Sequence, residues 1–136
     1  SGSLGAKLKT VEDLMISGSK IPFINENSNM KKALKLITKK RLGVLIAVNK
    51  KNYTTGIITD GQIRRSSQKN ILLNELAVKK VMTKNPISVE KNMLAVKGLA
   101  IMSENRITSL CVHKKNKRKK TIGILHIHNI LDGNIT

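Results

Sequence analysis

The spacing of apolar positions changes along this chain, and the changes predict a series of helices and strands. One apolar stripe has the i, i+3, i+4, i+7 spacing of a helix face, at Met30, Ala33, Leu34 and Ile37. Apolar runs of strand length follow at 44–48 and 55–59, joined by the polar stretch 49–52. A last helix is expected to begin after Thr59. Together with a short extended segment at Pro22–Ile24, this gives the order β-α-β-β-α.

The second half of the chain repeats this pattern. Three segments match in order: Val11–Met15 with Val78–Met82, Arg41–Val44 with Arg106–Ser109, and Gly56–Thr59 with Gly123–His126. The second half therefore also predicts two strands, at 109–113 and 121–125, and a last helix after His126. Collinear matches of this kind indicate an internal duplication.

Each half has about 60 residues, which is near the lower limit for one stable core. We therefore expect the halves to pack on each other, with a linker at 1–10, a first repeat at 11–68 and a second repeat at 69–136. A tandem β-α-β-β-α unit with Gly-apolar-apolar-Thr before its last helix resembles the CBS-domain pair, the module named after cystathionine β-synthase. The resemblance covers residues 11–132 and implies an α+β fold of tandem CBS repeats, packed as a pseudo-two-fold pair.

Four strings of residues narrow the resemblance. They are Leu42–Gly43, Gly56–Arg65, Arg106–Ser109 and Gly123–Leu131. In this order they look like the C-terminal half of bacterial D-arabinose-5-phosphate isomerases, and Ser1–Leu8 is similar to the linker that closes the sugar-isomerase (SIS) domain of that family. The family interconverts D-ribulose 5-phosphate and D-arabinose 5-phosphate for the synthesis of Kdo, an acid sugar of lipopolysaccharide. The resemblance implies a regulatory fragment without the catalytic SIS domain, so we expect no enzymatic activity and no cofactor in this chain.

The chain is strongly basic, with 26 basic and 8 acidic residues and a net charge of +18. Such a balance suggests an anionic partner: nucleic acid, a membrane surface or a phosphorylated metabolite. The basic residues are 21 lysines and 5 arginines, accompanied by 13 Asn and 17 Ile, a composition that an AT-rich genome also produces. Only Phe23 and Tyr53 could stack on bases, where single-strand binders use several aromatic rings. The longest apolar run, Leu42–Val48, is far shorter than the roughly 20 residues of a membrane span. We therefore expect neither nucleic acid nor a membrane as the partner.

Thr59 and Asp60 stand where a strand meets a helix N-terminus, and the free N–H groups there favour an anion. Many nucleotide-binding CBS repeats carry Thr-x-x-Asp, whose Asp holds ribose hydroxyls. Here that position is Gln62 in the first repeat and Asn129 in the second, which argues against an ordinary adenosine nucleotide. The alternative is that Thr59 and Asp60 only cap the helix.

The other candidates are arginine, histidine and hydroxyl side chains. An arginine pair can bind phosphate or carboxylate through parallel hydrogen bonds, or form a solvated face. His126 takes the position of Thr59 in the second repeat and is expected to face the cleft between the repeats, where it can bond a sugar hydroxyl or an anion. Cys111 and His113 could join His126 and His128 as zinc ligands, but the spacing is not a known zinc signature, so no metal is expected. The full set of candidate ligand-binding residues is Thr59, Asp60, Arg64, Arg65, Arg106, Thr108, Ser109, His126 and His128.

These observations predict a regulatory module that senses an anionic nucleotide, specifically a sugar nucleotide such as CMP-Kdo. Three alternatives remain: a generic adenosine-nucleotide sensor, a basic nucleic-acid-binding protein, and a structural dimerisation module with an empty cleft. We expect a homodimer formed through exposed apolar side chains of the last helices, Ile63, Ile130 and Leu131. The basic run 113–120 is expected to be a solvated hairpin loop. The single cysteine excludes an intrachain disulfide and fits a cytoplasmic location.

Overall fold

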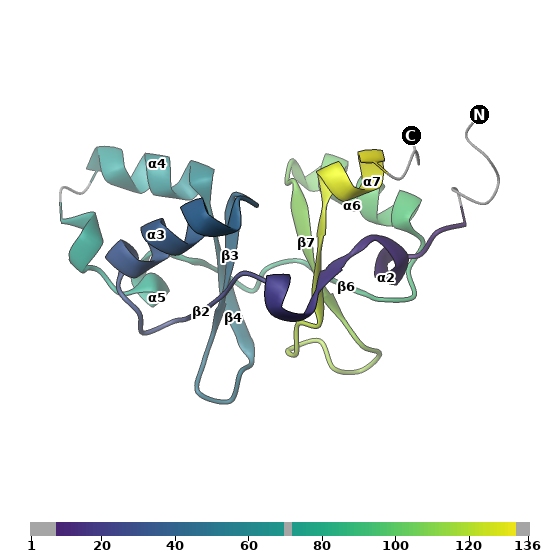
Figure 1. Cartoon of the computed structure of the whole chain (residues 1–136), viewed down its shortest axis with the longest axis horizontal. Helices are drawn as coiled ribbons and strands as arrows, with labels where there is room; N and C mark the ends of the chain where they lie inside the picture. Colours follow the sequence, from purple (N-terminus) through teal and green to yellow (C-terminus); the bar gives the residue numbers. More distant parts are fainter. Residues whose placement is uncertain (1–7, 70–71, 133–136) are drawn as a thin grey trace. The chain divides into compact units, whose positions relative to one another are not determined.

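The computed structural model describes residues 8–69 and 72–132, and these form two compact units (Figure 1). The central unit is Pro22–Pro86. The terminal unit combines the two ends of the described chain, 8–21 and 87–132. Among the described residues, no helix is long and apolar enough to cross a membrane.

The central unit is a small mixed sheet with helices packed against it. Its elements in chain order are β2 (Phe23–Asn25), α3 (Met30–Lys40), β3 (Val44–Val48), β4 (Thr54–Thr59), α4 (Asp60–Lys69), the 3₁₀ turn η2 (Leu73–Glu75), α5 (Val78–Val81) and β5 (Thr83–Lys84). The strand order is β2-β3-β4-β5, with β2 parallel to β3 and the other neighbours antiparallel. Helix α3 buries Met30, Ala33 and Ile37, as the apolar stripe predicts. It begins after Asn29, whose side chain accepts the Lys32 N–H (2.9 Å).

The terminal unit has the same plan. Its elements are α2 (Val11–Leu14), β1 (Ile16–Ser17), the 3₁₀ turn η1 (Gly18–Lys20), β6 (Ser88–Glu90), α6 (Ala95–Asn105), β7 (Ser109–His113), β8 (Gly123–His126) and α7 (Ile127–Asp132). Its sheet runs β1-β8-β7-β6, with β6 parallel to β7 and the other neighbours antiparallel. The α+β class and the β-α-β-β-α order of each half are therefore confirmed.

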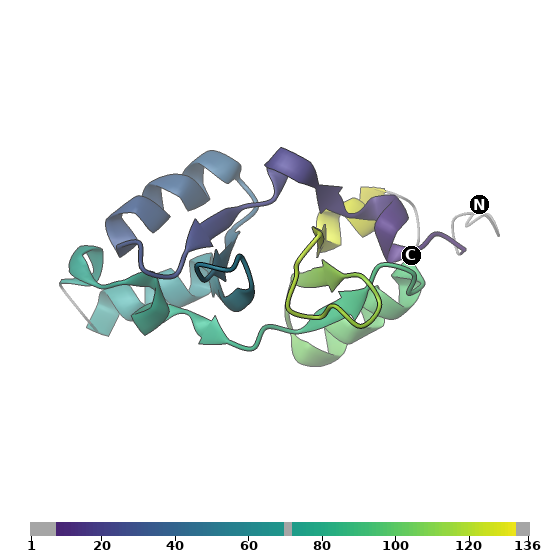
Figure 2. The same cartoon turned by 90° about the horizontal axis from the view of Figure 1, so that it is seen from below.

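Each unit takes its edge strand from the other half of the sequence. The segment α2–β1 belongs to the first repeat, 11–68, yet β1 pairs with β8 of the second. In the same way α5–β5 belongs to the second repeat, 69–136, yet β5 pairs with β4 of the first. The compact units therefore do not coincide with the sequence repeats 11–68 and 69–136, and residues 1–7 of the expected linker lie outside the described residues. Figure 2 shows the same two units from below.

In each unit a glycine of the adjoining strand contacts a methionine of the edge segment. These residues belong to two of the segments that match between the repeats. A Cβ added to Gly56 would collide with the side chain of Met82 and would lie 2.9 Å from the Thr83 carbonyl oxygen. Gly123 has the same relation to Met15, and its Cβ would lie 3.0 Å from the Ile16 carbonyl oxygen. The edge segment can approach the adjoining strand only because these two positions have no side chain.

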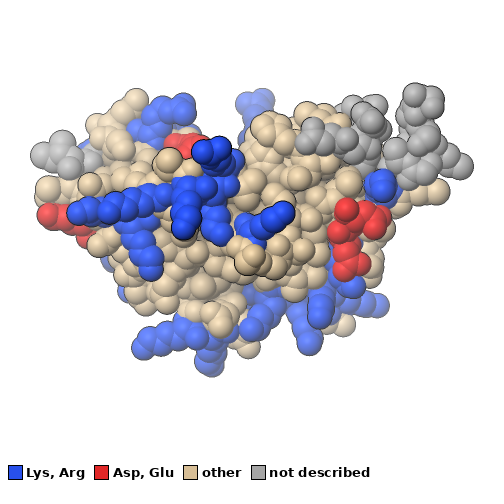
Figure 3. Space-filling model, viewed as in Figure 1, with Lys and Arg blue, Asp and Glu red and all other residues tan. Residues whose placement is uncertain are grey.

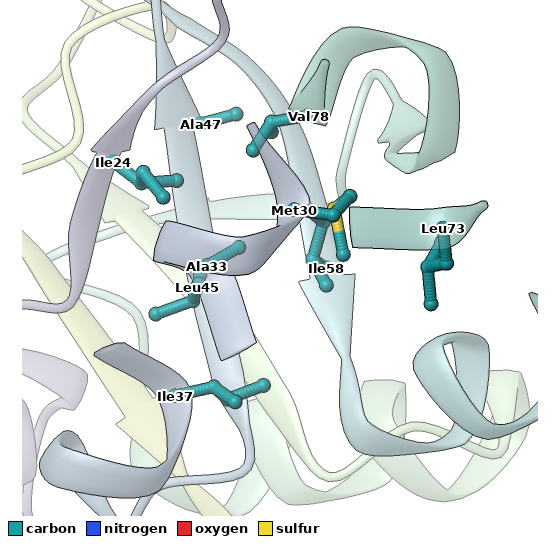
Figure 4. Close-up of a cluster of buried hydrophobic side chains, with 9 residues drawn as sticks. All are labelled: Ile24, Met30, Ala33, Ile37, Leu45, Ala47, Ile58, Leu73 and Val78. Carbon is teal, nitrogen blue, oxygen red and sulfur yellow. The ribbon is translucent and has the colours of Figure 1, made fainter. Parts of the chain in front are cut away.

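Each unit has its own apolar core. Figure 4 shows the central core, in which α3, η2 and α5 place side chains against β2, β3 and β4; its members are Ile24, Met30, Ala33, Ile37, Leu45, Ala47, Ile58, Leu73 and Val78. The terminal core is built from the equivalent elements, with Val11, Val89, Ala95, Met102, Leu110, Val112, Leu125 and Ile130. Every residue of β3 and of β7 is buried. This explains why β3 is apolar throughout, whereas β7 has an apolar centre with the buried polar residues Ser109 and His113 at its ends.

The prediction of an exposed apolar patch on the last helices is wrong. Ile130 is fully buried in the terminal core, and Ile63 packs against the central core. Only Leu131 of the three is an exposed large apolar residue, at 45 %. These short helices use their isoleucines to anchor themselves to their own sheets, so the patch offers no motive for dimerisation.

Candidate functional site

Thr59 and Asp60 lie at the junction of β4 and α4, as the sequence predicts. The Thr59 hydroxyl accepts the Gln62 N–H (3.3 Å), and the Gln62 side-chain oxygen accepts the Thr59 N–H (3.1 Å). This reciprocal pair is a capping box, which satisfies two backbone donors at the helix start. The Asp60 N–H donates to the Gly43 carbonyl (3.1 Å), and the Asp60 carboxylate lies against the Cα of Gly43, which has a positive φ of 68°. The capping alternative raised for Thr59 therefore describes its contacts in this structure.

Gln62 is held firmly instead of pointing to solvent. Besides the capping box, its side-chain amide donates to the Thr83 hydroxyl of β5 and to the Val81 carbonyl (3.5 Å). The amide thus ties α4 to the edge segment that comes from the other half of the chain. A carboxylate could not donate these bonds, so Gln62 is a structural link at the position where many CBS repeats carry Asp.

The two arginines of α4 differ in their surroundings. Arg65 folds back along the helix, with its Nη1 3.2 Å from where a Cβ on Gly61 would lie. It also lines a pocket between α4 and β5. Arg64 is exposed and is not among the residues that line this pocket.

The terminal unit brings together a second set of candidates. His126 ends β8 and pairs with Ser109 of β7, and both side chains are buried, at 8 % and 7 % exposure. The His126 Nδ1 accepts the N–H of His128 (3.2 Å), so the neutral ring carries its proton on Nε2. The two histidine rings are 4.7 Å apart and tilted by 57°. Thr108 lies beside them, since its carbonyl accepts the Ile127 N–H (2.8 Å).

The candidate residues of the two units occupy equivalent positions in the two repeats. His126 occupies the place of Thr59 at the end of a strand, and Thr108 takes the place of Gly43 as acceptor for the first helical N–H. Arg106 is the left-handed C-cap of α6 (φ 54°), as Arg41 is of α3 (φ 59°). Thr59, Asp60, Arg64 and Arg65 belong to the central unit, whereas Arg106, Thr108, Ser109, His126 and His128 belong to the terminal unit.

Cys111 and His113 have roles in the terminal core. Cys111 is 1 % exposed, and burial raises the pKa of its thiol to about 11. His113 bonds the Ser88 hydroxyl through Nδ1 (2.6 Å), and burial lowers its pKa, opposed by Glu90 and assisted by Arg118. Within 8–69 and 72–132, no three His, Cys, Asp or Glu side chains are grouped to hold a metal ion.

The basic surface is dispersed. The prediction of a solvated loop over 113–120 is confirmed for 114–120, which are exposed throughout, but it is wrong for His113, a buried residue of β7. Figure 3 shows lysine and arginine side chains over much of one face, with few acidic ones between them. Lys91 and Glu12 form the one ion pair found among the described residues (3.1 Å). Most of the positive charge therefore has no acidic partner within the described part of the chain.

The paired α+β units with exchanged edge strands are matched by a known family. The CBS domain model matches residues 11–69 and again residues 78–134, and the chain belongs to this family as a tandem CBS pair.

Two relatives match nearly the whole of this chain at about a third identity. Arabinose 5-phosphate isomerase KdsD of Salmonella typhi is 35 % identical over 131 residues, which are 96 % of this chain and 39 % of that enzyme. An uncharacterized protein of Rickettsia prowazekii is 34 % identical over 130 residues with the same shares. The chain thus spans about two fifths of the length of the curated relatives that it matches.

Solved structures support the fold. The CBS-domain containing protein ATU1752 from Agrobacterium tumefaciens superposes with a TM-score of 0.84 at 16 % identity, covering 98 % of each chain. The CBS domain pair of protein MJ0100, solved with 5′-methylthioadenosine and S-adenosyl-L-methionine, gives a TM-score of 0.78 at 20 % identity, covering 92 % of this chain and 94 % of that one.

Sequence reasoning missed the partners of α4. Gln62 was singled out for the charge that it lacks, but its tie to Thr83 joins residues that are distant in sequence. Ser66 and Lys69 also line the pocket beside α4. Their spacing from Gln62, at i+4 and i+7, places all three on one helix face and could have been read from the sequence.

Proposed function

We propose that this chain is the metabolite-sensing regulatory module of a sugar isomerase that interconverts D-ribulose 5-phosphate and D-arabinose 5-phosphate. The observation that carries the proposal is the identity of about a third to KdsD isomerases over 96 % of the chain. Since the chain spans 39 % of those enzymes, the isomerase reaction would belong to the remainder, an SIS domain in the parent protein. The proposal includes a role of the parent in the cytoplasmic synthesis of Kdo for lipopolysaccharide.

The proposed ligand is an anionic sugar nucleotide such as CMP-Kdo, the activated end product of that pathway. In the central unit, Thr59 and Asp60 lie where α4 begins, and Arg65 folds back toward Gly61 beside them. In the terminal unit, His126 and His128 are joined at the start of α7, next to Ser109. A ligand with a phosphate and a carboxylate would suit these cations and hydrogen-bond donors. The net charge of +18 would raise its local concentration.

Regulation requires that the ligand bind two states of the parent unequally. We further propose that the module forms a homodimer, as the resemblance to other CBS pairs implies. Binding could then bias the attached catalytic domains by stabilising one arrangement of the dimer. Light scattering at micromolar concentration tests this part, and a monomer mass would contradict it.

A generic adenosine-nucleotide sensor is the second candidate, and the MJ0100 pair with its adenosine-containing ligands favours it. The contacts of Gln62 oppose it. A ribose at this position would have to compete with Thr83 for the amide, and no carboxylate is available there to accept its hydroxyls. Asn129 likewise provides no charge at the equivalent place in the terminal unit.

Isothermal titration of the folded chain separates the candidates. CMP-Kdo is expected to bind more tightly than AMP, and Thr59→Ala and His126→Ala are each expected to weaken CMP-Kdo binding at least fivefold. Asn29→Ala is the matched control, because it removes the cap of α3 without touching the proposed ligand residues. Tighter binding of AMP, or unchanged CMP-Kdo affinity in both variants, would reject the proposed ligand.

A further inference from the structure

The central unit contains a pocket of about 250 Å³ between α4 and β5. Five side chains line it: Gln62, Arg65, Ser66, Lys69 and Thr83. All five are polar, two are cationic and none is acidic. Because every lining residue belongs to the central unit, the pocket is complete within that unit.

The two cations of this pocket have no acidic partner. Arg65 and Lys69 are one turn apart on α4, and like charges at this spacing weaken a helix. Within the part of the chain that the structure describes, no carboxylate comes within salt-bridge distance of either side chain. The pocket therefore collects two positive charges that the protein itself does not neutralise.

Core packing does not explain why these residues stand here. Helix α4 has no buried residue, and Ile63 is its one side chain that packs against the core. Arg65, Ser66 and Lys69 lie on the side of the helix that faces β5. A helix needs only an apolar stripe to dock on a sheet. On α4, the side that faces the edge strand β5 instead carries two cations and a hydroxyl.

The floor of the pocket is preorganised. The Gln62 amide is fixed at both ends, by the Thr59 N–H on one side and by Thr83 on the other. Arg65 can fold back along the helix because Gly61 has no Cβ in the way. Both N–H groups of this amide are already donated, to Thr83 and to the Val81 carbonyl. The donors left for a guest are the two cations and the hydroxyls of Ser66 and Thr83.

We propose that this pocket binds a phosphate monoester, such as the phosphate end of a phosphorylated sugar. A monoester carries nearly two negative charges at neutral pH and three acceptor oxygens, which match a guanidinium, an ammonium and the hydroxyls of Ser66 and Thr83. The volume of about 250 Å³ is below the usual range for pockets that hold drug-sized ligands, so it is suited to a phosphate with part of its sugar. The inference goes beyond the proposed function, because a sugar-nucleotide diester carries only one charge on its phosphate and gains less here.

The terminal unit does not repeat this pocket. At the offset that relates Gln62 to Asn129, Arg65 corresponds to Asp132, which reverses the charge. At the same offset Lys69 corresponds to Thr136, whose side chain has no charge. One phosphate site per chain is therefore expected.

The test is an NMR titration of the isotope-labelled chain with inorganic phosphate and, separately, ribose 5-phosphate, at constant ionic strength. Saturable shifts are expected in the amides of 62–69 and of Thr83, with millimolar affinity and one site per chain. Arg65→Gln and Lys69→Gln should each weaken binding at least fivefold. Arg64→Gln removes the same charge from the same helix outside the pocket, and should change the affinity less than twofold.

The outcomes separate this site from the proposed function. Phosphate binding with the expected variant pattern, without any binding of CMP-Kdo, supports the pocket and rejects the proposed ligand. Binding of CMP-Kdo that is unaffected by Lys69→Gln, together with non-saturating phosphate shifts spread over all lysines, overturns the pocket and leaves the proposed function standing. An equal loss of phosphate affinity in the Arg64→Gln control also overturns the pocket, because binding would then depend on the total charge of the helix and not on the pocket residues.

Discussion

Gly56→Ala tests how closely the edge segment with β5 packs against β4. The added Cβ would meet the Met82 side chain and the Thr83 carbonyl oxygen, which is only 2.9 Å from the Cβ position. A methionine side chain can move aside, but Thr83 is paired in register with Ile57 of the adjoining strand. The strand pairing must therefore give way as well, and overpacking of this kind costs about 1–3 kcal/mol.

A smaller effect acts in the opposite direction. Alanine restricts the unfolded chain more than glycine does, which stabilises the folded state by about 0.4–1 kcal/mol. At the middle of both ranges the net loss is about 1.3 kcal/mol, or a fall in Tm of about 5 °C for a chain of this length. Gly123→Ala should behave in the same way, since its Cβ would meet Met15 and the Ile16 carbonyl oxygen at 3.0 Å.

A double-mutant cycle with Met82→Ala identifies the cause. In that background Gly56→Ala should cost less than in the native chain, because the side-chain collision is gone, but it should still cost something because the Thr83 carbonyl remains. Urea denaturation followed by circular dichroism gives the four free energies of unfolding. An unchanged or higher stability of Gly56→Ala, or an equal loss in both backgrounds, would refute the packing argument.

The other predictions concern single contacts. Replacing the five lysines of loop 114–120 with serine should leave Tm unchanged or slightly higher, since exposed like charges repel; a fall of many degrees would mean that the loop is packed. His113 has a lowered pKa in the folded state, so the unfolded chain binds protons more readily, and stability should fall as pH drops below about 6.5; His113→Asn should flatten that slope in urea titrations. Cys111 should resist thiol reagents at pH 8 until the chain unfolds, because its pKa is about 11 and it is buried. Gln62→Ala should lower the free energy of unfolding by about 1–2 kcal/mol through loss of the capping box and the β5 tie, whereas Gln68→Ala on the same helix should be nearly neutral.

Much of the fold could be predicted because its signals are local. The stripe of α3 and the runs of β3 and β7 follow directly from which faces are buried, and their bounds agree with the structure to within a residue or two. Helix starts are harder to locate from sequence alone. Ser28 and Asn92 are plausible caps by residue type, but α3 begins after Asn29 and α6 after Leu94. Capping depends on where the chain turns, and several polar residues near a helix start fit equally well.

The exchange of edge strands could not be read from the sequence. The matching segments Val11–Met15 and Val78–Met82 indicate that each repeat has an edge segment. A strand of two residues is too short, however, for its sequence to indicate which strand it pairs with. The same limit applies to Gln62, whose role depends on Thr83 reaching it through that exchange. Likewise Ile130 looked exposed because the helix around it is short, whereas its burial follows from docking on the terminal core.

The two repeats share a scaffold but have diverged at the helix that closes each unit. The positions that build the scaffold are alike: a strand end that caps the helix, an isoleucine that docks it, and a glycine–methionine contact at the edge. Two other positions differ, since Arg64 and Arg65 in α4 correspond in sequence to Leu131 and Asp132. The scaffold contacts recur in both units, whereas both arginines of α4 are exposed and do not belong to the core of their unit. This makes the chemistry of α4, with its cations and its pocket, the part of the chain where function is to be sought.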